Sequence, residues 1–395
     1  MPHPVPTLTR HVPVQARSRR EYESITLTPT VAIFRKRLLS YTETFIADQG
    51  LFLPTYRPLF CGYREDRSGL HLLDGAKRIL LEEYESMPAL SKLGLRLGLG
   101  GAGSWLDAIS EHSPSLIHAH FFNDGMDALK LGRRLALPVI TTVHGHDITK
   151  HENTADAVKS ASRLFDRVER IIAVSDFIAE QALALGCPEQ KLVQHYIGID
   201  LDKFSQPKLE SSEPSLLFVG RLVEKKGCTY LLQAMEQLKA RHPELWLTII
   251  GEGELKPALR EEASRRQLKV EFAGSASAAE IRDQLARCWV FVAPSIVAAS
   301  GDSEGLGMVF LEAQALQTPV VSFRSGGVVE AVEEGKTALL SEEKDSTGLA
   351  RDISALLEDS SLRQTMGREG RKRVERYFDV RKQCAGLESI YDSVR

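Results

Sequence analysis

Short apolar segments alternate with helical patterns along most of this chain of 395 residues, and this alternation constrains the fold more than any other feature. Each apolar segment is followed by a tight polar turn and then by a segment with helical periodicity. Repeats of this kind are typical of a parallel sheet that is covered by helices on both faces. The expected strands form two series, 31–34, 115–120, 139–143, 170–174 and 192–196 first, and then 215–219, 245–250, 270–272, 290–293 and 320–323.

The two series are separated by residues 201–214, which hold two prolines, three serines and mixed charges and are therefore interpreted as a linker. The sequence thus predicts two Rossmann-like α/β domains, at 31–200 and 215–377, that face each other across a cleft. Two helices are expected in the tail, and the last one covers 379–395. Residues 1–30 contain five prolines and no periodic pattern, so we expect a flexible extension there.

The composition argues against several classes of protein. A formal net charge of −3 gives no support to a nucleic-acid partner. The five cysteines are scattered without a CxxC pair, as in proteins with reduced thiols and unlike disulfide-rich or zinc-binding domains. No apolar run reaches the roughly 18 residues that cross a bilayer, and no apolar core follows the first arginines as it would in a signal peptide. We therefore expect a cytoplasmic protein.

Residues 76–106 raise the question of a membrane contact. They interleave leucines with lysines and arginines before a glycine-rich segment and Trp105. Such mixtures occur in segments that lie on a membrane surface, and the basic run Arg35-Lys36-Arg37 agrees with a peripheral contact at the cytoplasmic face. We favour the alternative, in which 76–106 forms two helices packed on the first domain beside a loose glycine loop.

The stretch 301–312, with the sequence GDSEGLGMVFLE, carries the strongest functional signal. It lies between the expected strand 290–293 and a helix expected to begin at Met308. Open α/β sheets bind ligands at the carboxyl ends of their strands, and the free N–H groups of a helix start favour a phosphate. Glu304 lies before the helix and Glu312 inside it, so both can face one ligand. We interpret this stretch as a nucleotide-diphosphate site.

Other turns at the same sheet edge supply cations and glycines. After the first strand of the second domain, Arg221 offers a planar fork for a diphosphate and Lys226 a point charge. Gly251 and Gly253 follow the second strand and allow the backbone to approach a ligand closely. Phe272 is at the end of the third strand, where it would border a base. Each residue alone is a weak signal, but their convergence on one sheet edge indicates a binding site.

The charges of these residues suggest how a diphosphate would be held. Arg221, Lys226 and the helix start at Gly307 and Met308 would bind a leaving diphosphate and stabilise the negative charge that develops on it. Such groups can replace a metal ion. The D-x-D sequence at 200–202 lies at the linker and is interpreted as a turn, so we expect no metal.

The two glutamates would have separate roles. Glu312 would accept hydrogen bonds from a ribose diol. Glu304 would bind a sugar hydroxyl or stabilise positive charge at an anomeric carbon. Between them, Gly305 and Leu306 belong to the turn that would border the sugar.

In the first domain the residues leave more than one interpretation open. Thr42, Glu43 and Thr44 follow the first strand at a binding position, but an N-cap made by Ser40 or Thr42 accounts for them equally well. We interpret His118 and His120, which alternate on a buried strand, as core residues, and Ser175 as an N-cap.

These motifs resemble the donor domain of family 4 glycosyltransferases with the GT-B fold. The resemblance rests on Glu304-x7-Glu312, Gly220-Arg221 with Lys226-Gly227, Gly251-Glu-Gly253 and Ser325-Gly-Gly-Val-Val-Glu330. Upstream, the first domain resembles the acceptor domain of the subgroup that builds bacterial exopolysaccharides of the colanic-acid type. The motifs there are Thr42-Glu43-Thr44-Phe45-Ile46, His118-Ala-His120-Phe121, Thr142-Val-His144-Gly145-His146-Asp147 and Ala173-Val-Ser175.

The resemblance implies a retaining, metal-independent transfer of a sugar from a UDP- or GDP-linked donor to a saccharide or lipid-linked saccharide, with no cofactor. It implies that His144 meets the donor sugar near the anomeric centre and that the last helix crosses back to the first domain. Thr42, Glu43, Thr44 and Asp147 would then lie in the acceptor region. The glycine-rich loop that many members place after the first strand is absent here, which leaves the acceptor contacts open.

Two other classes of function are compatible with parts of this pattern. A GT-B sugar-nucleotide epimerase or a phosphorylase would use the same fold, but the Glu304 and Glu312 pair favours transfer. A non-catalytic nucleotide-sugar-binding regulator or scaffold is disfavoured because every donor-site position carries a suitable residue.

Overall fold

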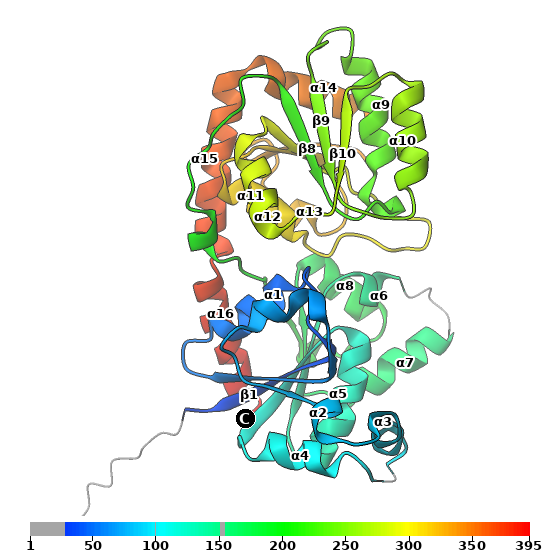
Figure 1. Cartoon of the computed structure of the whole chain (residues 1–395), viewed down its shortest axis with the longest axis vertical. Helices are drawn as coiled ribbons and strands as arrows, with labels where there is room; N and C mark the ends of the chain where they lie inside the picture. The colour runs from blue at the N-terminus through cyan, green and yellow to red at the C-terminus, as the bar shows by residue number, and fades with distance from the viewer. Residues whose placement is uncertain (1–27, 99, 151–154) are drawn as a thin grey trace, which may run out of the picture.

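The structure is a computed structural model that describes residues 28–98, 100–150 and 155–395, and it contains two parallel sheets, one in each half of the chain (Figure 1). The first sheet has seven strands in the order β3-β2-β1-β4-β5-β6-β7, and the second has six in the order β10-β9-β8-β11-β12-β13. Both sheets carry helices on their two faces, so the predicted pair of doubly wound α/β domains is confirmed. Residues 1–27 of the predicted extension lie outside the described residues, and Thr30 begins β1.

The first half holds the strands β1 (Thr30–Leu38), β2 (Arg57–Glu65), β3 (Arg78–Leu80), β4 (Pro114–His120), β5 (Val139–Val143), β6 (Arg170–Ala173) and β7 (Leu192–Gln194). Its helices are α1 (Thr44–Leu51), α2 (Leu81–Tyr84), α3 (Pro88–Leu97), α4 (Gly103–Ser110), α5 (Phe122–Leu135), α6 (His146–Thr149), α7 (Ala155–Phe165) and α8 (Asp176–Ala184), with 3-10 turns at η1 (Arg67–Leu73), η2 (Glu189–Lys191) and η3 (Leu201–Phe204).

The second half holds β8 (Ser215–Val219), β9 (Trp246–Ile250), β10 (Val270–Gly274), β11 (Val290–Val292), β12 (Val320–Phe323) and β13 (Ala338–Ser341). Its helical elements are η4 (Glu224–Lys226), α9 (Cys228–Leu238), α10 (Lys256–Arg265), α11 (Ala278–Arg287), α12 (Met308–Ala315), α13 (Val328–Ala331), α14 (Ser346–Glu358), α15 (Ser360–Tyr377) and α16 (Val380–Asp392). None of the described helices is both long and apolar enough to span a bilayer.

All ten expected strands are present, but the sequence did not predict β2, β3 and β13. The interpretation of 76–106 as two helices was wrong at Ile79 and Leu80, which form β3 against β2. Three residues carry no measurable period, and only the pairing of residues 78–80 with residues 60–62 of β2 makes this segment a strand. Helices α2, α3 and α4 then follow.

The structure tests the predictions for two helix caps and two strand histidines. Ser175 caps α8, since its side chain accepts a hydrogen bond from the N–H of Ile178. A cap made by Ser40 or Thr42 was wrong: the residue before α1 is Glu43, and no side-chain cap bond forms there. The carboxylate of Glu43 is engaged elsewhere, as described below. The strand histidines at 118 and 120 are fully buried, as expected.

The last helix crosses back to the first half. Helix α15 lies on the second half, and α16 continues to pack against the first half beside α1 (Figure 1). The carboxylate of Glu388 in α16 accepts backbone N–H groups of Thr55 and Tyr56, both at 2.7 Å. The chain therefore passes between the two halves twice, at residues near 200 and again near 379, where Ile199 and Asp379 form a β-bridge.

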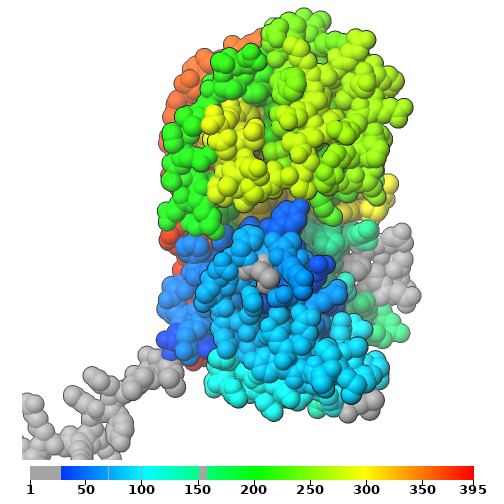
Figure 2. Space-filling model, viewed as in Figure 1, coloured from blue at the N-terminus to red at the C-terminus, as the bar shows by residue number. Residues whose placement is uncertain are grey.

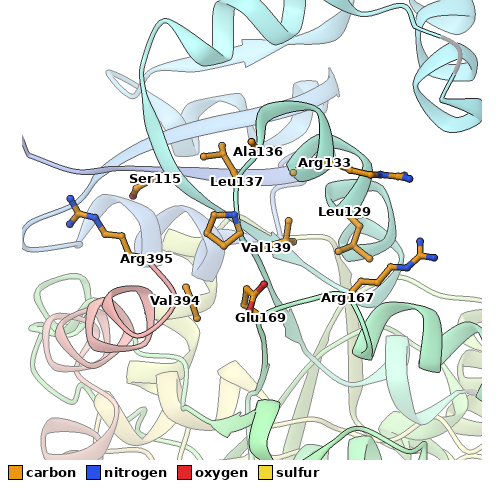
Figure 3. Close-up of a pocket in the computed structure, with 12 residues that line it drawn as sticks. Ser115, Leu129, Arg133, Ala136, Leu137, Val139, Arg167, Glu169, Val394 and Arg395 are labelled. Atoms are coloured by element: carbon orange, nitrogen blue, oxygen red, sulfur yellow. The ribbon is translucent and has the colours of Figure 1, made fainter.

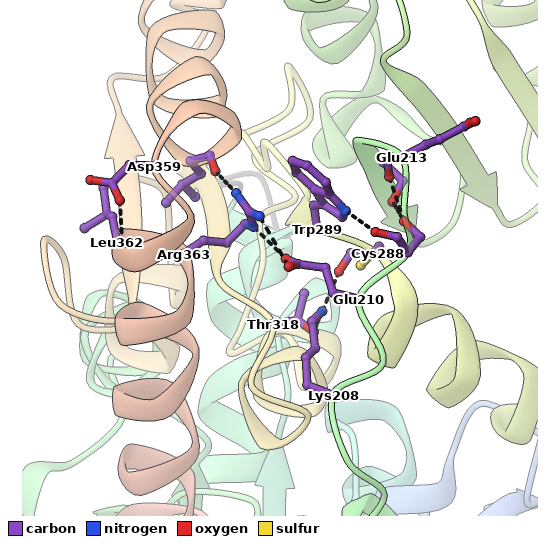
Figure 4. A network of polar contacts seen from close by, with 12 residues as sticks. Lys208, Glu210, Glu213, Cys288, Trp289, Thr318, Asp359, Leu362 and Arg363 are labelled. Carbon is purple, nitrogen blue, oxygen red and sulfur yellow. Dashed lines mark hydrogen bonds and ion pairs between the residues drawn. The ribbon is translucent and has the colours of Figure 1, made fainter.

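The segment between the two sheets is attached to the second half by a polar network (Figure 4). The ammonium of Lys208 donates to the carbonyl of Leu285 at 3.3 Å and to Thr318 Oγ1 at 2.8 Å. Further along, Glu210 pairs with Arg363 at 2.6 Å, and the Arg363 guanidinium lies 4.0 Å from the centre of the Trp289 ring. Buried or half-buried charges that are paired in this way fix the course of the connection.

Candidate active site

Two cavities are candidates for the active site. The larger, of about 900 Å³, lies at the amino ends of the first sheet, near Ser115 and Val139 (Figure 3). The other, of about 400 Å³, lies between the carboxyl ends of the strands in both halves. Open parallel sheets bind ligands at their carboxyl ends, so we assign the site to the second cavity, which we call the cleft cavity. Figure 2 shows how closely the two halves meet.

The cleft cavity draws residues from both halves. The first half contributes Thr42, Glu43, Phe45, Phe121, His144, Gly145, His146, Val174 and Ile197, and the second half Arg221, Lys225, Glu304, Gly305, Leu306, Gly307 and Met308. The structure therefore brings together nine of the residues singled out in the sequence: Thr42, Glu43, His144, Arg221, Glu304, Gly305, Leu306, Gly307 and Met308.

Glu304 lies at the centre of the second half's contribution. Its carboxylate forms a close ion pair with Lys226, and both side chains are 13 % exposed. Burial by itself would raise the pKa of the Glu304 carboxyl, but the charges of Lys226 and Lys225 outweigh that effect and hold the pKa below its usual value. Glu304 is therefore an anion at neutral pH, positioned just before the start of α12.

The turn η4 is fastened to the loop that carries Glu304. Glu224 accepts the N–H of Ala299 at 3.1 Å, and Lys225 donates to Asp302 at 2.8 Å. Together with the pair between Lys226 and Glu304, three successive residues thus hold the loop. Sequence reasoning missed Lys225, and the only signal was its position next to Lys226.

His144 is positioned by a turn at the end of β5. Both oxygens of the Asp147 carboxylate are taken by backbone groups: Oδ1 accepts the N–H of His144 at 3.0 Å and of Gly145 at 2.8 Å, and Oδ2 that of Phe122 at 3.0 Å. Asp147, which the sequence placed in the acceptor region, lies outside the residues that line the cavity. Its visible role is to shape the turn that presents His144.

The first half contributes one carboxylate, that of Glu43, to the wall of the cleft cavity. The guanidinium of Arg35 pairs with both Glu43 and Asp124 and lies 4.4 Å from the centre of the Phe121 ring. The other oxygen of Glu43 accepts the N–H of Ser40 at 3.1 Å. The Glu43 carboxylate is thereby fixed on the wall of the cleft cavity. Thr44, the neighbouring residue, begins α1 and does not line the cavity.

Several donor-side residues lie away from the cleft cavity. Glu312 is half-buried in α12, where burial raises the pKa of its carboxyl to about 7; Arg282 lowers that value in part. A Cβ on Gly251 would lie 1.9 Å from the carbonyl oxygen of Gly220, so this glycine allows two turns to meet. Gly253 similarly faces the carbonyl of Leu222, and Phe272 packs near Arg260.

The two halves also contact each other directly beside the cavity. The Ser175 hydroxyl donates to the carbonyl of Gly305 at 2.6 Å. The carboxylate of Glu330, from α13, accepts the N–H groups of Asp176 at 2.7 Å and Phe177 at 2.8 Å. A carboxylate at the first turn of a helix is favourable because it pairs free N–H donors and complements the helix dipole. Glu330 of the second half therefore stabilises the start of α8 in the first half.

Replacing Glu330 by alanine should loosen this contact. Losing a side-chain cap costs about 1 kcal/mol, so amide exchange at Asp176 and Phe177 should accelerate about fivefold. Hydrogen–deuterium exchange of the peptide at the start of α8 measures this. Glu334→Ala, an exposed carboxylate nearby, is the matched control and should leave the rate unchanged. Equal rates in both variants would contradict the proposed contact.

Among the described residues, no three histidine, cysteine, aspartate or glutamate side chains come together as a metal site. The polar groups that converge on the cleft cavity are instead two anions and at least two cations, with the free N–H groups of α12 nearby. Such a set can bind a phosphate-bearing ligand and stabilise charge that changes during a reaction.

Family comparisons agree with this arrangement. The family model described as glycosyl transferases group 1 matches residues 200–373, and that described as glycosyltransferase family 4 matches residues 62–203. A putative colanic acid biosynthesis glycosyltransferase, WcaL of Escherichia coli K12, is 32 % identical over 280 residues, which cover 68 % of this chain and 69 % of that protein. The amylovoran biosynthesis glycosyltransferase AmsK of Erwinia amylovora is 32 % identical over 215 residues, or 53 % of each chain.

Solved structures show the same fold at lower identity. The Anabaena protein Alr3699/HepE, crystallised with UDP and glucose, has a TM-score of 0.74 and 19 % identity, and the alignment covers 92 % of this chain and all of that one. A glycosyltransferase from Rickettsia africae has a TM-score of 0.75 and 18 % identity, with 93 % and 98 % of the chains covered. Both likenesses confirm the expected GT-B fold.

Proposed function

We propose, since this chain belongs to the family 4 glycosyltransferases, that it transfers a sugar from a nucleotide diphosphate to a saccharide or lipid-linked saccharide. It is a glycosyltransferase; the nature of the donor, the retention of configuration and the independence from metal are the proposal. The observation that carries it is the convergence of Arg221, Glu304 and the start of α12 on one cavity.

The donor diphosphate would lie against the second half. Arg221 would bind it through the guanidinium fork, Lys226 through its ammonium, and the backbone N–H groups at Gly307 and Met308 through the helix start. These groups would offset the charge that develops on the leaving diphosphate, which is the task a metal ion performs elsewhere. Glu312 would contact the ribose, and Gly251, Gly253 and Phe272 would border the base.

The donor sugar would lie between the two halves. Glu304 would face it from one side, with Gly305 and Leu306, and His144 from the other. An anion beside the anomeric carbon stabilises the positive charge that grows there when the bond to the diphosphate breaks. Closure of the two halves around the bound sugar would keep water out, so transfer would be favoured over hydrolysis.

The acceptor would enter from the first half. Thr42 and Glu43 line the cavity, and the carboxylate of Glu43 is held by Arg35, so it can accept a hydrogen bond from an acceptor hydroxyl. The relatives named for colanic acid and amylovoran biosynthesis support an acceptor that belongs to an exopolysaccharide or another cell-surface glycan. We place this reaction in the cytoplasm.

A panel of UDP- and GDP-sugars tests the proposal. The cognate donor should raise the melting temperature, because binding stabilises the folded state by an amount set by affinity. With a saccharide acceptor, the product should keep the anomeric configuration of the donor, as read by proton NMR, and the rate should be unchanged in EDTA. A product with inverted configuration would contradict the retaining mechanism, and loss of the rate in EDTA would contradict the independence from metal. The absence of both binding and transfer with every donor would overturn the proposal.

A contact with the cytoplasmic membrane face is a second, separate proposal. Helix α3 exposes Leu90, Leu93 and Leu97, which share one face, while Leu95 on the opposite face is buried. An apolar stripe turned outward is unusual for a helix on a soluble domain, and a bilayer surface would cover it.

Sedimentation with vesicles of phosphatidylethanolamine and phosphatidylglycerol tests the membrane contact. The wild type should co-sediment, and a Leu90→Ser, Leu93→Ser double variant should do so at least tenfold less, since each buried leucine contributes about 1.5–3 kcal/mol. Leu183→Ser, at another exposed leucine, is the control. A wild type that stays in the supernatant, or an α3 variant that changes only the oligomeric state, would exclude the bilayer as the partner.

A further inference from the structure

A row of aromatic side chains connects the cleft cavity to the C-terminal helix. His144 lines the cavity, and its Nε2 lies 3.1 Å from Nδ1 of His120. The His120 ring packs on that of His118, with 4.3 Å between ring centres. Nδ1 of His118 in turn lies 2.8 Å from the hydroxyl of Tyr391 in α16, and its Nε2 lies 2.7 Å from Thr142 Oγ1.

The contact between His120 and His144 restricts where the protons lie. Burial holds the pKa of both imidazoles well below the usual value, so each ring is neutral and carries one N–H. One proton must therefore lie between His120 Nδ1 and His144 Nε2. Either His144 donates through Nε2 and its Nδ1 is a bare acceptor, or His120 donates and His144 carries its proton on Nδ1.

The surroundings of His144 decide between these two forms. Its Nδ1 is buried and has no hydrogen-bond partner among the described residues. A buried N–H without an acceptor is rarer in folded proteins than an acceptor that lacks a donor. His144 should therefore donate from Nε2 to His120 and keep Nδ1 unprotonated. A ring rotated by 180° about the Cβ–Cγ bond would lose the bond to His120, so the same contact also fixes the ring orientation.

We propose that His120 is a positioning residue that fixes the orientation and tautomer of His144, and that His118 and Tyr391 hold His120 in place. The consequence rests on the proposed function: His144 would meet the donor sugar in one fixed ring orientation, with Nδ1 unprotonated. Helix α16, although it comes from the end of the chain, would then be part of the support of the active site.

The remaining contacts of these rings agree with a support role. His118 and His120 are 0 % and 1 % exposed, so neither reaches a ligand directly. His144 is also flanked by the rings of Phe121 at 4.5 Å and Phe45 at 5.0 Å between centres, which restrict its sideways motion. These rings limit where the imidazole can move, but only His120 bonds to a ring nitrogen of His144 among the described residues.

Nitrogen NMR of protein labelled with ¹⁵N-histidine tests the tautomer without any activity assay. Wild-type His144 should show one bare Nδ1 and one protonated Nε2, assigned by comparison with His144→Gln. In His120→Ala the two signals should move toward a common averaged value. In His120→Asn they should return toward the wild-type pattern, because the Asn side-chain amide occupies a position similar to that of imidazole Nδ1. His71→Ala, at an exposed histidine, is the control.

Kinetics give a second readout. His120→Ala should lower kcat by about tenfold to a hundredfold with little change in the donor KM, because a misplaced group weakens the transition state while the nucleotide binds the other half. Tyr391→Phe removes a single hydroxyl and should lower kcat by a smaller factor than His120→Ala does. Because this change is mild, it tests the same contact even if the alanine variant does not fold. His120→Asn should recover most of the loss.

The two readouts separate this inference from the proposed function. A wild-type His144 protonated on Nδ1, or a tautomer that His120→Ala leaves unchanged in folded protein, would overturn the inference whatever the activity. If the tautomer changes as expected while the wild type transfers no sugar, the positioning of His144 stands and the proposed reaction fails.

Discussion

Replacing Glu304 by glutamine should reduce turnover by about a thousandfold while nucleotide binding is kept. Glutamine has nearly the same shape, so the variant removes a negative charge and little else. Loss of one group that stabilises transition-state charge typically costs 10²–10³ in kcat. Binding of free UDP or GDP should be unchanged or tighter, because the variant removes an anion near the diphosphate and frees Lys226, which now pairs with Glu304.

The measurement compares kcat with nucleotide affinity from calorimetry in the same preparation. Glu334→Gln, which alters an exposed carboxylate in the same half, is the matched control and should leave both quantities unchanged. A Glu304→Gln enzyme that keeps more than a tenth of wild-type kcat would argue against a role for this charge in the reaction. Loss of nucleotide binding instead of turnover would make Glu304 a ligand for the nucleotide.

The pH dependence should follow from the same ion pair. Because the charges of Lys226 and Lys225 hold the pKa of Glu304 below its usual value, the carboxylate stays ionised throughout the neutral range. A carboxyl whose pKa is lowered on folding stabilises the folded state at pH values above its usual pKa. This contribution of Glu304 to stability is lost only as the pH falls through the pKa of the folded state. We therefore expect no loss of kcat between pH 6 and 8 that is attributable to Glu304.

The donor half was predictable from the sequence because its signals are local. Arg221 follows β8 closely, and Glu304 and the start of α12 come after β11 in the next loop and helix of the chain, while the carboxyl ends of parallel strands share one sheet edge. The two parallel sheets were predictable for the same reason, because the alternation of short apolar segments with helical patterns is also a local signal. Strands β3 and β13 were not predicted because segments of three or four residues are too short to show a periodic pattern of apolar residues. Only pairing with a neighbouring strand defines them.

The contacts between the halves were not predictable because they join residues far apart in the chain. Glu330 belongs to a recognised motif, but nothing near it in the sequence indicates that its carboxylate caps α8, 153 residues away. His118 and His120 were rightly expected to be buried, yet burial alone did not reveal the bond from His120 to His144. Lys225 was passed over because a run of two lysines does not say which of them reaches the cavity.

Gly305 shows how the two halves constrain one another at the cleft. Its carbonyl accepts the hydroxyl of Ser175 at 2.6 Å, and a Cβ added to it would lie 1.9 Å from the carbonyl oxygen of His144. On the other side, the backbone of Gly305 lies so close to Gly327 that a Cβ there would meet the Gly305 carbonyl at 1.9 Å. The loop is thus packed between backbone atoms on both sides, and neither side can yield through a side-chain rotation.

Gly305→Ala should therefore separate the two halves near the reacting groups. Heavy atoms cannot approach to 1.9 Å, so His144 and Glu304 must move apart, and a displacement of about 1 Å between such groups costs about a hundredfold in rate. Overpacking should also lower the free energy of unfolding by about 1–3 kcal/mol. Nucleotide affinity should change little, because Arg221 and Lys226 belong to the second half alone.

Three measurements on one preparation check this expectation: kcat, nucleotide affinity, and unfolding in urea. Gly103→Ala is the matched control, since a Cβ there would meet no atom within 4 Å. If Gly305→Ala lost nucleotide binding together with activity, the damage would lie in the second half and not between the halves. If it kept kcat within about twofold of the wild type, the close approach of His144 to the Glu304 loop would be irrelevant to the reaction, and the His144 contact with the donor sugar would lose its structural basis.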